Sequence, residues 1–275
     1  MKIDVHAHCF IPDSVAFRAI AMMTSSVKGI IEPNGDGTIK NLLDTMERDG
    51  IDISLMLPIA TKPNHHDIIL QNAIALQDGS LDERTKRMIV PFASAHPLDP
   101  KLDVHLDEIA SHGIKGIKFH PYYQNFSLDD PSVWPMFRKI AELGLVVQCH
   151  CGYDIGYPDR FDACGPKEIA TLLKNVKGLK FIAAHLGGCA GYEPHATDEI
   201  IELGCYADTS ALERDHAKPE QQRLLREWPK ETLMFGTDFP WTNPARSAAW
   251  VESIRAEDDL DAIFSANAKR LLQLT

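Results

Sequence analysis

The chain has 275 residues, 44% of them hydrophobic, and its 28 basic and 39 acidic residues give a net charge of −11. This length suits one α/β barrel of about 250 residues. The acidic balance argues against nucleic acid or an anionic membrane as a partner, and no apolar run is long enough to span a bilayer. Six cysteines without disulfide spacing, and an N-terminus without a signal pattern, predict a cytoplasmic protein with reduced thiols.

Short apolar runs alternate with amphipathic segments along the whole chain. We expect strands at Lys2–His6, Asp52–Leu57, Arg87–Ala93, Lys115–His120, Leu145–His150, Leu179–His185, Cys205–Asp208 and Thr232–Asp238. We expect helices at Ile39–Asp49, His66–Asp78, Leu102–Ser111, Pro131–Leu143, Pro166–Asn175, Thr197–Leu203, Pro219–Trp228 and Pro244–Ile254, with one or two closing helices in Asp258–Leu274. Strict alternation predicts a parallel sheet, and eight units favour a single-domain (β/α)8 TIM barrel over residues 1–275.

The links between these elements differ at the two ends of the strands. Helix-to-strand links are tight and contain a glycine, whereas strand-to-helix links such as Cys9–Thr38 and Cys151–Gly165 are long and polar. In a barrel the long links lie at the carboxyl ends of the strands, where barrel active sites are found. The first link is the longest and includes the apolar piece Val15–Met23, so we expect it to act as a lid.

The first strand carries a His-x-His pair, His6 and His8, whose alternation places both imidazoles on one face. Two imidazoles about 7 Å apart along a strand can converge on one ion at the end of the strand. An exposed edge strand that carries two histidines by chance is the alternative. The pair by itself therefore does not decide between these two interpretations.

Other strand ends supply further polar residues. Lys118 and His120 share a face at the end of the fourth expected strand, and His150, His185 and Asp238 end the fifth, sixth and eighth. A buried strand seldom ends in histidine unless that side chain has a partner. Imidazoles with one carboxylate are a suitable ligand set for Zn²⁺ or a similar divalent ion.

These motifs, in this order, resemble the amidohydrolase superfamily of metal-dependent barrels. The phrases Gly-Ile-Lys-Phe-His-Pro around Lys118 and Gly-Thr-Asp-Phe-Pro around Asp238 are most similar to the amidohydrolase-related branch. That branch contains aminocarboxymuconate-semialdehyde and resorcylate decarboxylases and some lactonases. The resemblance covers essentially the whole chain and rests on the ordered set of motifs.

The resemblance implies one divalent metal, most simply Zn²⁺, held by His6, His8, His150 and Asp238. A metal lowers the pKa of its bound water to about 7 and so provides hydroxide at neutral pH. His185 would act as base or electrostatic partner of that water, and Asp238 could shuttle its proton instead. Both are therefore candidate catalytic residues.

Lys118 has two interpretations. A lysine on the fourth strand is carboxylated and bridges two metals in binuclear members of the superfamily. An ordinary ammonium that binds a substrate carboxylate is the alternative, and we favour it, since one metal is usual in this branch. His120, Tyr153 and Trp241 are then expected to contact substrate.

Three further features have structural explanations. Asp4 either orients a ligand or pairs with a lysine, and Asp208 followed by Thr209 and Ser210 is expected to cap a helix or turn. Cys149 and Cys151 flank His150 and are expected to point toward the helix layer.

The leading hypothesis is a metal-dependent hydrolase that uses a metal-activated water on a small polar or carboxylated substrate. A non-oxidative decarboxylase of an aromatic or muconate-type acid, or a lactonase, would use the same scaffold. A non-catalytic barrel would have a damaged ligand set, and here every expected position is filled. We expect a small-molecule substrate and no macromolecular partner other than a second copy in a homodimer.

Overall fold

The computed structural model describes residues 1–26, 32–154, 156–157, 162–188, 192–211 and 218–274. Its strands are β1 (Ile3–Ala7), β2 (Ile53–Met56), β3 (Ile89–Pro91), β4 (Gly116–Phe119), β5 (Val146–Cys149), β6 (Lys180–Ala183), β7 (Tyr206–Asp208) and β8 (Leu233–Met234). The predicted strands are therefore all present; β1 is shifted by one residue at equal length, and the others are shorter than the apolar runs that predicted them.

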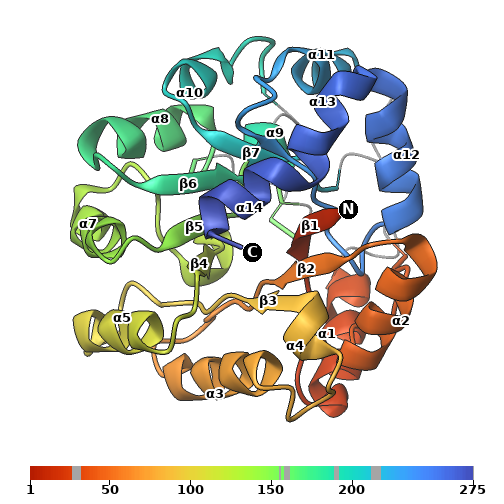
Figure 1. The fold of residues 1–275 in the computed structure, drawn as a ribbon. Helices are drawn as coiled ribbons and strands as arrows, with labels where there is room; N and C mark the ends of the chain where they lie inside the picture. The colour runs from red at the N-terminus through yellow and green to blue at the C-terminus, as the bar shows by residue number, and fades with distance from the viewer. Residues whose placement is uncertain (27–31, 155, 158–161, 189–191, 212–217, 275) are drawn as a thin grey trace.

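Helices follow the strands and surround them (Figure 1). They are α1 (Asp13–Ser26), α2 (Ile39–Asp49), α3 (His66–Gln77), α4 (Thr85–Met88), α5 (Leu102–Ser111), α6 (Pro121–Gln124), the 3-10 turn η1 (Pro131–Val133), α7 (Trp134–Glu142), α8 (Pro166–Asn175), α9 (Ala184–Gly188), α10 (Asp198–Glu202), α11 (Pro219–Glu227), α12 (Pro244–Ile254), α13 (Glu257–Asp261), the π-helical segment η3 (Ala262–Ala266) and α14 (Asn267–Leu272).

The strands form two parallel ladders, β1-β2-β3 and β4 to β8 in order. Single parallel bridges join the ladders, Ala93 with Ile117 on one side and Ala7 with Phe239 on the other. Backbone hydrogen bonds continue across both joints, for example from Lys118 N to the Ala93 carbonyl at 2.9 Å. The sheet therefore closes on itself, and the predicted (β/α)8 barrel is confirmed.

Helix α2 shows how the sequence sets the boundaries of an element. The Thr38 side chain accepts a hydrogen bond from the Asn41 amide and caps the first turn. Leu42, Leu43 and Met46 form its buried face, and each such side chain contributes about 1.5–3 kcal/mol on burial. Gly50 ends the helix at φ 72°, a left-handed conformation that a side chain would disfavour.

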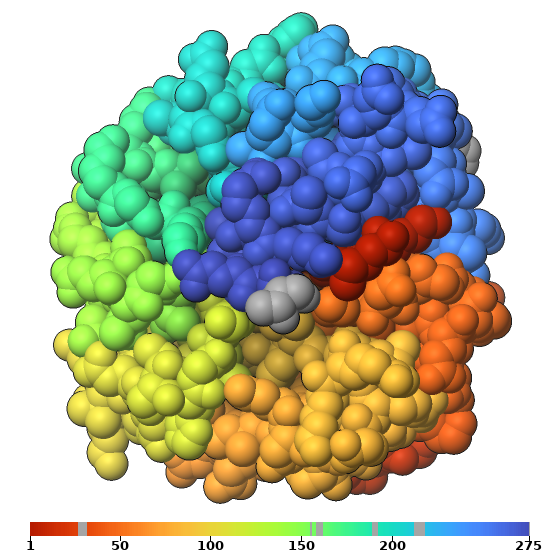
Figure 2. Space-filling view, in the orientation of Figure 1, coloured from red at the N-terminus to blue at the C-terminus, as the bar shows by residue number. Residues whose placement is uncertain are grey.

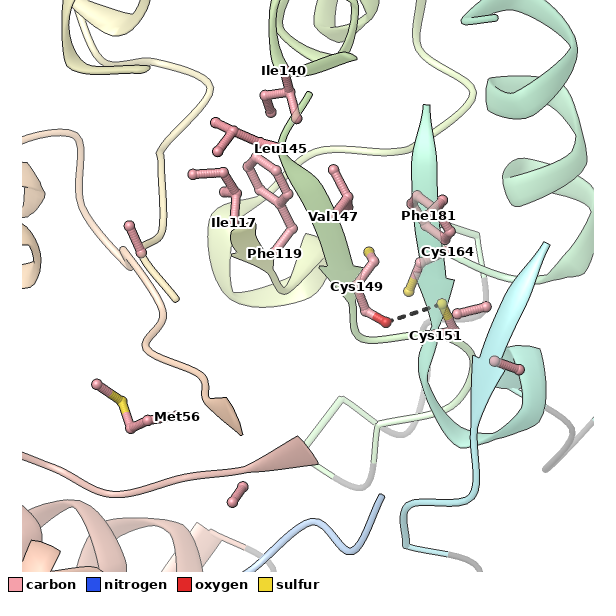
Figure 3. Close-up of a cluster of buried hydrophobic side chains, with 14 of the residues drawn as sticks. Met56, Ile117, Phe119, Ile140, Leu145, Val147, Cys149, Cys151, Cys164 and Phe181 are labelled. Carbon is pink, nitrogen blue, oxygen red and sulfur yellow. Dashed lines mark hydrogen bonds between the residues drawn. The ribbon is translucent and has the colours of Figure 1, made fainter. Parts of the chain in front are cut away.

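The layer between strands and helices is apolar (Figure 3). Phe119, Val147, Cys149 and Phe181 point from the strands into this layer, and Cys151 joins them. The described cysteines form no disulfide bonds, and their side chains are buried. The expectation that Cys149 and Cys151 pack toward the helices is therefore confirmed.

A second apolar cluster fills the end of the barrel where β1 begins, and α14 crosses that end (Figures 1 and 2). Ile3 and Val5 belong to this cluster, whereas Ala7 of the same strand packs in the helix-facing layer. The register of β1 against β2 shifts between Asp4 and Ala7, and such a bulge re-aims the side chains on either side of it. Strict alternation along β1, which the sequence predicts, is therefore interrupted.

Two other elements differ from expectation. The first long link contains α1, of which only Ala16 is buried, while Phe17 and Met22 are exposed. The expected lid lies partly outside the described residues. The closing segment is a continuous helical stretch, α13, η3 and α14, in which the middle is π-helical. No helix among the described residues is long and apolar enough to cross a membrane.

Candidate metal centre

Three predicted ligands meet at the carboxyl end of the barrel. The donor atoms of His6, His8 and Asp238 lie within 4.8 Å of one another. Asp238 Oδ1 is 3.4 Å from His8 Nε2 and 3.7 Å from His6 Nε2. Residues at opposite ends of the chain meet here because β8 is the neighbour of β1 in the closed barrel.

Hydrogen bonds at the far side of each ring orient the two imidazoles. His8 Nδ1 lies 2.8 Å from the Leu57 carbonyl, and His6 Nδ1 lies 2.9 Å from Asp208 Oδ2. Both partners can only accept, so Nδ1 carries the proton and Nε2 is a lone pair in each neutral ring. Two lone pairs and a carboxylate oxygen then face one another, an arrangement that a divalent cation satisfies.

Burial and charge control the protonation of this cluster. Burial, and next the Lys118 charge, lower the pKa of His6 to about 3. Burial alone would raise the pKa of Asp238, but His8 and next the other neighbouring histidines hold it well below its usual range. At neutral pH the centre therefore has an unprotonated His6 beside an ionised Asp238 carboxylate, which are the forms that bind metal.

The backbone is left-handed where two of these strands end. Asp238 has φ 70°, and His185, Leu186 and Gly187 have φ between 50° and 73°. Residues other than glycine seldom adopt this conformation, and they do so mostly at functional sites. The predicted strands Leu179–His185 and Thr232–Asp238 are too long for this reason: the chain leaves the sheet before His185 and Asp238.

His150 and His185 form a second pair beside this cluster. His150 Nδ1 lies 3.1 Å from His185 Nε2, and His185 Nδ1 lies 2.8 Å from the Ser210 hydroxyl. The ring centroids of His185 and His6 are 5.2 Å apart. The structure thus brings His185 against the cluster, whereas His150 contacts it through His185.

Lys118 is the buried cation of the centre. Its side chain is 1% exposed, and its Nζ lies 3.1 Å from His6 Nε2. Burial lowers the pKa of this amine. Lys118 Nζ therefore lies beside the predicted ligands. This position suits both interpretations of Lys118, an ammonium that binds a substrate anion and a carboxylated lysine that binds metal.

A family model for amidohydrolases matches residues 3–274. This chain belongs to the amidohydrolase family. The chain is an enzyme of that family, and the centre described above lies at the carboxyl end of its barrel. The resemblance proposed from the motifs is confirmed, and so is the fold class.

Solved structures share the fold of this amidohydrolase at low sequence identity. The 5-carboxyvanillate decarboxylase of Sphingomonas paucimobilis is 16% identical over 100% of this chain and 99% of its own, with a TM-score of 0.72. A probable 2-pyrone-4,6-dicarboxylic acid hydrolase of Acinetobacter baumannii is 14% identical over 99% of each chain, with a TM-score of 0.66.

The 5-carboxyvanillate decarboxylase of Novosphingobium aromaticivorans, described with bound manganese, is 14% identical over 100% of this amidohydrolase and 97% of its own chain, with a TM-score of 0.69. No curated protein sequence matches. At these identities the likeness establishes the fold alone.

The three residues of this amidohydrolase that are predicted to contact substrate differ in their burial and in their neighbours. His120 is 5% exposed, and its ring stacks on that of His150 with centroids 4.0 Å apart. Trp241 is 8% exposed, and its amide donates a hydrogen bond to the Asp238 carbonyl at 2.8 Å. Tyr153 is half-buried in the link after β5. Their contact with substrate stays a prediction.

Three residues of the centre are missing from the predicted site. Asp208 contacts His6 and also accepts hydrogen bonds from the His185 and Ser210 amides. Besides capping that turn, as expected, it is a partner of a predicted ligand. Gln148 Nε2 donates to Asp208, and the Ser210 hydroxyl lies 2.9 Å from His6 Nδ1. Alternation from His150 back to Gln148 is the available signal for Gln148, and alternation from Asp208 to Ser210 is the signal for Ser210, which the sequence predicts to be part of a cap.

Asp4 holds the backbone beside two predicted ligands, which fits the first of its two alternative roles and not the lysine pair. Its carboxylate accepts hydrogen bonds from the Thr237 amide and hydroxyl at 2.9 and 2.6 Å, and from the His6 amide at 3.0 Å. Burial raises its pKa to about 7. Asp4 therefore fastens β1 to the segment that carries Asp238, and the expected lysine pair is wrong.

Proposed function

We propose that this protein is a metal-dependent hydrolase that acts on a small polar or carboxylated molecule. The observation that carries the proposal is the cluster of His6 Nε2, His8 Nε2 and Asp238 Oδ1, three acceptors turned toward one another. A single divalent cation can bind all three of these atoms, and Zn²⁺ is the ion that we propose for them.

His150 would complete the set from beside the centre, where its Nδ1 lies 3.1 Å from His185 Nε2. A divalent ion bound there supplies Lewis-acid chemistry, since it polarises a substrate oxygen and lowers the pKa of water. His185 is the base in this proposal because its ring lies between His6 and His150 and is oriented by Ser210. Asp238 would hold the ion, and in the alternative assignment Asp238, in place of His185, takes the proton of the attacking water.

The remaining predicted residues would bind the substrate. Lys118 offers a cation within 3.1 Å of His6 Nε2, so a carboxylate next to the reacting group suits the site. His120, Tyr153 and Trp241 would line the space around it, and we propose a homodimer as the assembly. Lys118 acts here as an ordinary amine and not as a carboxylated bridge between two ions.

A non-oxidative decarboxylase is the second candidate. Two of the structural neighbours described above are 5-carboxyvanillate decarboxylases, and the same barrel would serve that reaction. His6, His8 and Asp238 would then hold an ion that binds the substrate carboxylate or hydroxyl. A lactonase that uses the histidines without metal is a third form of the same proposal.

The first experiment measures metal. The purified protein is expected to contain about one equivalent of Zn²⁺ or Mn²⁺, and chelation followed by each ion in turn shows which of them restores activity. Asp238→Asn is expected to lose the ion, whereas Asp67→Asn, on helix α3, keeps it. A protein that never binds a divalent ion contradicts the proposal.

The second experiment identifies the reaction. The metal-loaded protein is incubated with small esters, lactones and amides of carboxylic acids, and separately with hydroxylated aromatic and muconate-type acids. Acid release from the first group supports a hydrolase, and CO₂ release from the second supports a decarboxylase. Lactone opening that survives chelation supports the metal-free lactonase and rules out the metal-dependent mechanism.

A further inference from the structure

An acidic residue outside the predicted site is aimed at His120. Asp154, in the link after β5, is 8% exposed, and its Oδ2 lies 3.0 Å from His120 Nε2. Its other oxygen accepts a hydrogen bond from the Gly156 amide at 2.6 Å, which fixes the carboxylate. Since a carboxylate only accepts, Nε2 of His120 must donate.

Aromatic rings on both faces fix the plane of the His120 ring. Tyr123 stacks on one face with centroids 3.8 Å apart and an interplanar angle of 14°, and His150 stacks on the other at 4.0 Å and 9°. The His120 amide donates to Gln124 Oε1 at 2.8 Å, which also holds the start of α6 in place. The direction of each ring nitrogen is therefore set by the fold.

The second nitrogen of this ring has no partner among the described residues. His120 Nδ1 is buried and makes no hydrogen bond, although the ring is close enough to feel the charges of His8, His185 and Asp238. A buried polar atom is normally paired, so one without a partner at an active centre is a position for a ligand atom. In the neutral ring this Nδ1 is an acceptor.

We propose that Asp154 positions His120 so that Nδ1 accepts a hydrogen bond from a hydroxyl or amide N–H of the bound substrate. This inference rests on the proposed function, because the substrate is the molecule held at the His6, His8 and Asp238 centre. It assigns Asp154 as a positioning residue and His120 as a specificity-determining one. A substrate without a donor at this point leaves Nδ1 unsatisfied and binds more weakly.

A second cation held by His120, His150 and Asp154 is the competing explanation, since their donor atoms also lie within 4.8 Å of one another. The ring geometry argues against it. The two imidazoles are nearly parallel, so their in-plane lone pairs point along separate planes and cannot converge on one ion. The Nε2 atom of His120 is moreover already engaged by the carboxylate.

The test compares two probes that differ in one donor. Calorimetry measures the binding of 3-hydroxybenzoate and of 3-methoxybenzoate, which has no donor, to the zinc-loaded protein. The wild type is expected to bind the hydroxy acid about tenfold more tightly, the usual effect of one well-placed hydrogen bond. His120→Phe, which preserves the ring stack, and Asp154→Ala are expected to lose this preference, while Asp154→Asn retains it through its amide oxygen.

Metal content and thermal unfolding are measured on each variant. A wild type without zinc defeats the proposed function. A zinc-loaded wild type that binds neither acid, or binds both equally, overturns this inference alone, and so does a preference that survives in His120→Phe. Loss of a second equivalent of zinc in His120→Phe supports the second cation and overturns the hydrogen-bond role.

Discussion

Among the described residues, four groups of side chains each gather two histidines and an aspartate, and two of these groups differ sharply in how their rings are oriented. The central group is His6, His8 and Asp238 at the mouth of the barrel. The peripheral group is His66, Asp67 and His105, between α3 and α5. In both, the donor atoms lie within 4.8 Å of one another, so the distance between donor atoms does not distinguish the two groups.

Ring orientation distinguishes them. The His6 and His8 rings meet at 73° with centroids 5.1 Å apart, so their lone pairs can converge. The His66 and His105 rings are stacked at 3.8 Å with an interplanar angle of 1°, so their lone pairs lie in parallel planes. The two groups therefore differ in the direction of their imidazole lone pairs, which is set by what each ring contacts. Histidines act together as metal ligands when these lone pairs converge.

The partners of the rings explain this difference. At the centre, the acceptors come from the barrel wall, Leu57 after β2 and Asp208 on β7, and leave both Nε2 atoms directed inward. At the periphery, His66 Nε2 lies 3.0 Å from Glu108, and His105 Nδ1 lies 2.5 Å from Asp99. Glu108 therefore ties the start of α3 to α5, whereas Asp99 precedes α5 and holds His105 of that helix. We interpret the peripheral group as structural.

The largest expected effect comes from removing a central ligand. His8→Ala should weaken zinc binding by more than about 100-fold, beyond the effect of losing an outer partner. Zinc at 100 times its Kd should stabilise the wild type by about 2.7 kcal/mol, and this gain should vanish in the variant. Thermal unfolding with and without zinc measures it. His105→Ala is the matched control, and an equal loss in that variant would erase the contrast between the groups.

The next effect tests the orientation of His6. Asp208→Asn keeps the size of the side chain but can present an N–H toward His6 Nδ1, which disturbs its tautomer. We expect zinc affinity to fall about 10- to 100-fold, measured by competition with a chromophoric chelator. Asp99→Asn, the equivalent change at the peripheral group, should leave the affinity unchanged. Unchanged affinity in Asp208→Asn would show that the carboxylate only supports the fold.

A smaller effect is expected from the peripheral histidines. His66→Ala should cost about 1–3 kcal/mol in the free energy of unfolding, since it removes a buried ring and its bond to Glu108. The zinc content, measured by elemental analysis, should stay at the wild-type value. Loss of an equivalent of metal in this variant would show that stacked rings can rearrange to bind an ion.

The smallest effect is expected at an ion-pair cluster that is part of neither histidine group. In this cluster Arg223 pairs with Glu220 and Glu227. The hydrogen bond from Arg223 lowers the pKa of Glu220 from its usual 4.5. A carboxyl whose folded pKa is depressed contributes stability above its ordinary pKa, and this is lost as the pH falls toward the lowered value. Arg223→Gln should therefore cost up to about 1 kcal/mol at pH 7 and less at pH 4, measured by urea unfolding. A cost independent of pH would assign the loss to packing.

Most of the helices and all eight strands follow from local pattern. Helices α2, α5, α8 and α12 begin and end where apolar periodicity, caps and prolines predict. The strands end early where the next residues turn left-handed, as at His185, since the backbone conformation there depends on neighbouring strands. The short helices α4, α6 and α9 are too brief to show periodicity and were missed.

In the candidate site, too, some residues can be predicted from the sequence and others cannot. Lys118, His120, His150, His185 and Asp238 could be found because each lies near the carboxyl end of an apolar run that predicts a barrel strand. Asp154 could not, since it belongs to a long link whose course no periodicity describes. Asp208 was noticed as the end of a strand but was assigned to capping, because sequence does not show that β7 faces His6 across the barrel.

The sequence alone determined the alternation of strand and helix, and with it the rim on which the polar residues gather, since side-chain periodicity and helix-ending glycines act over a few residues. Only the tertiary structure decided which ring nitrogen is protonated, which way each lone pair points and which carboxylates support them. Those properties depend on contacts between residues as distant as His6 and Asp208, and such contacts exist only once the barrel has closed.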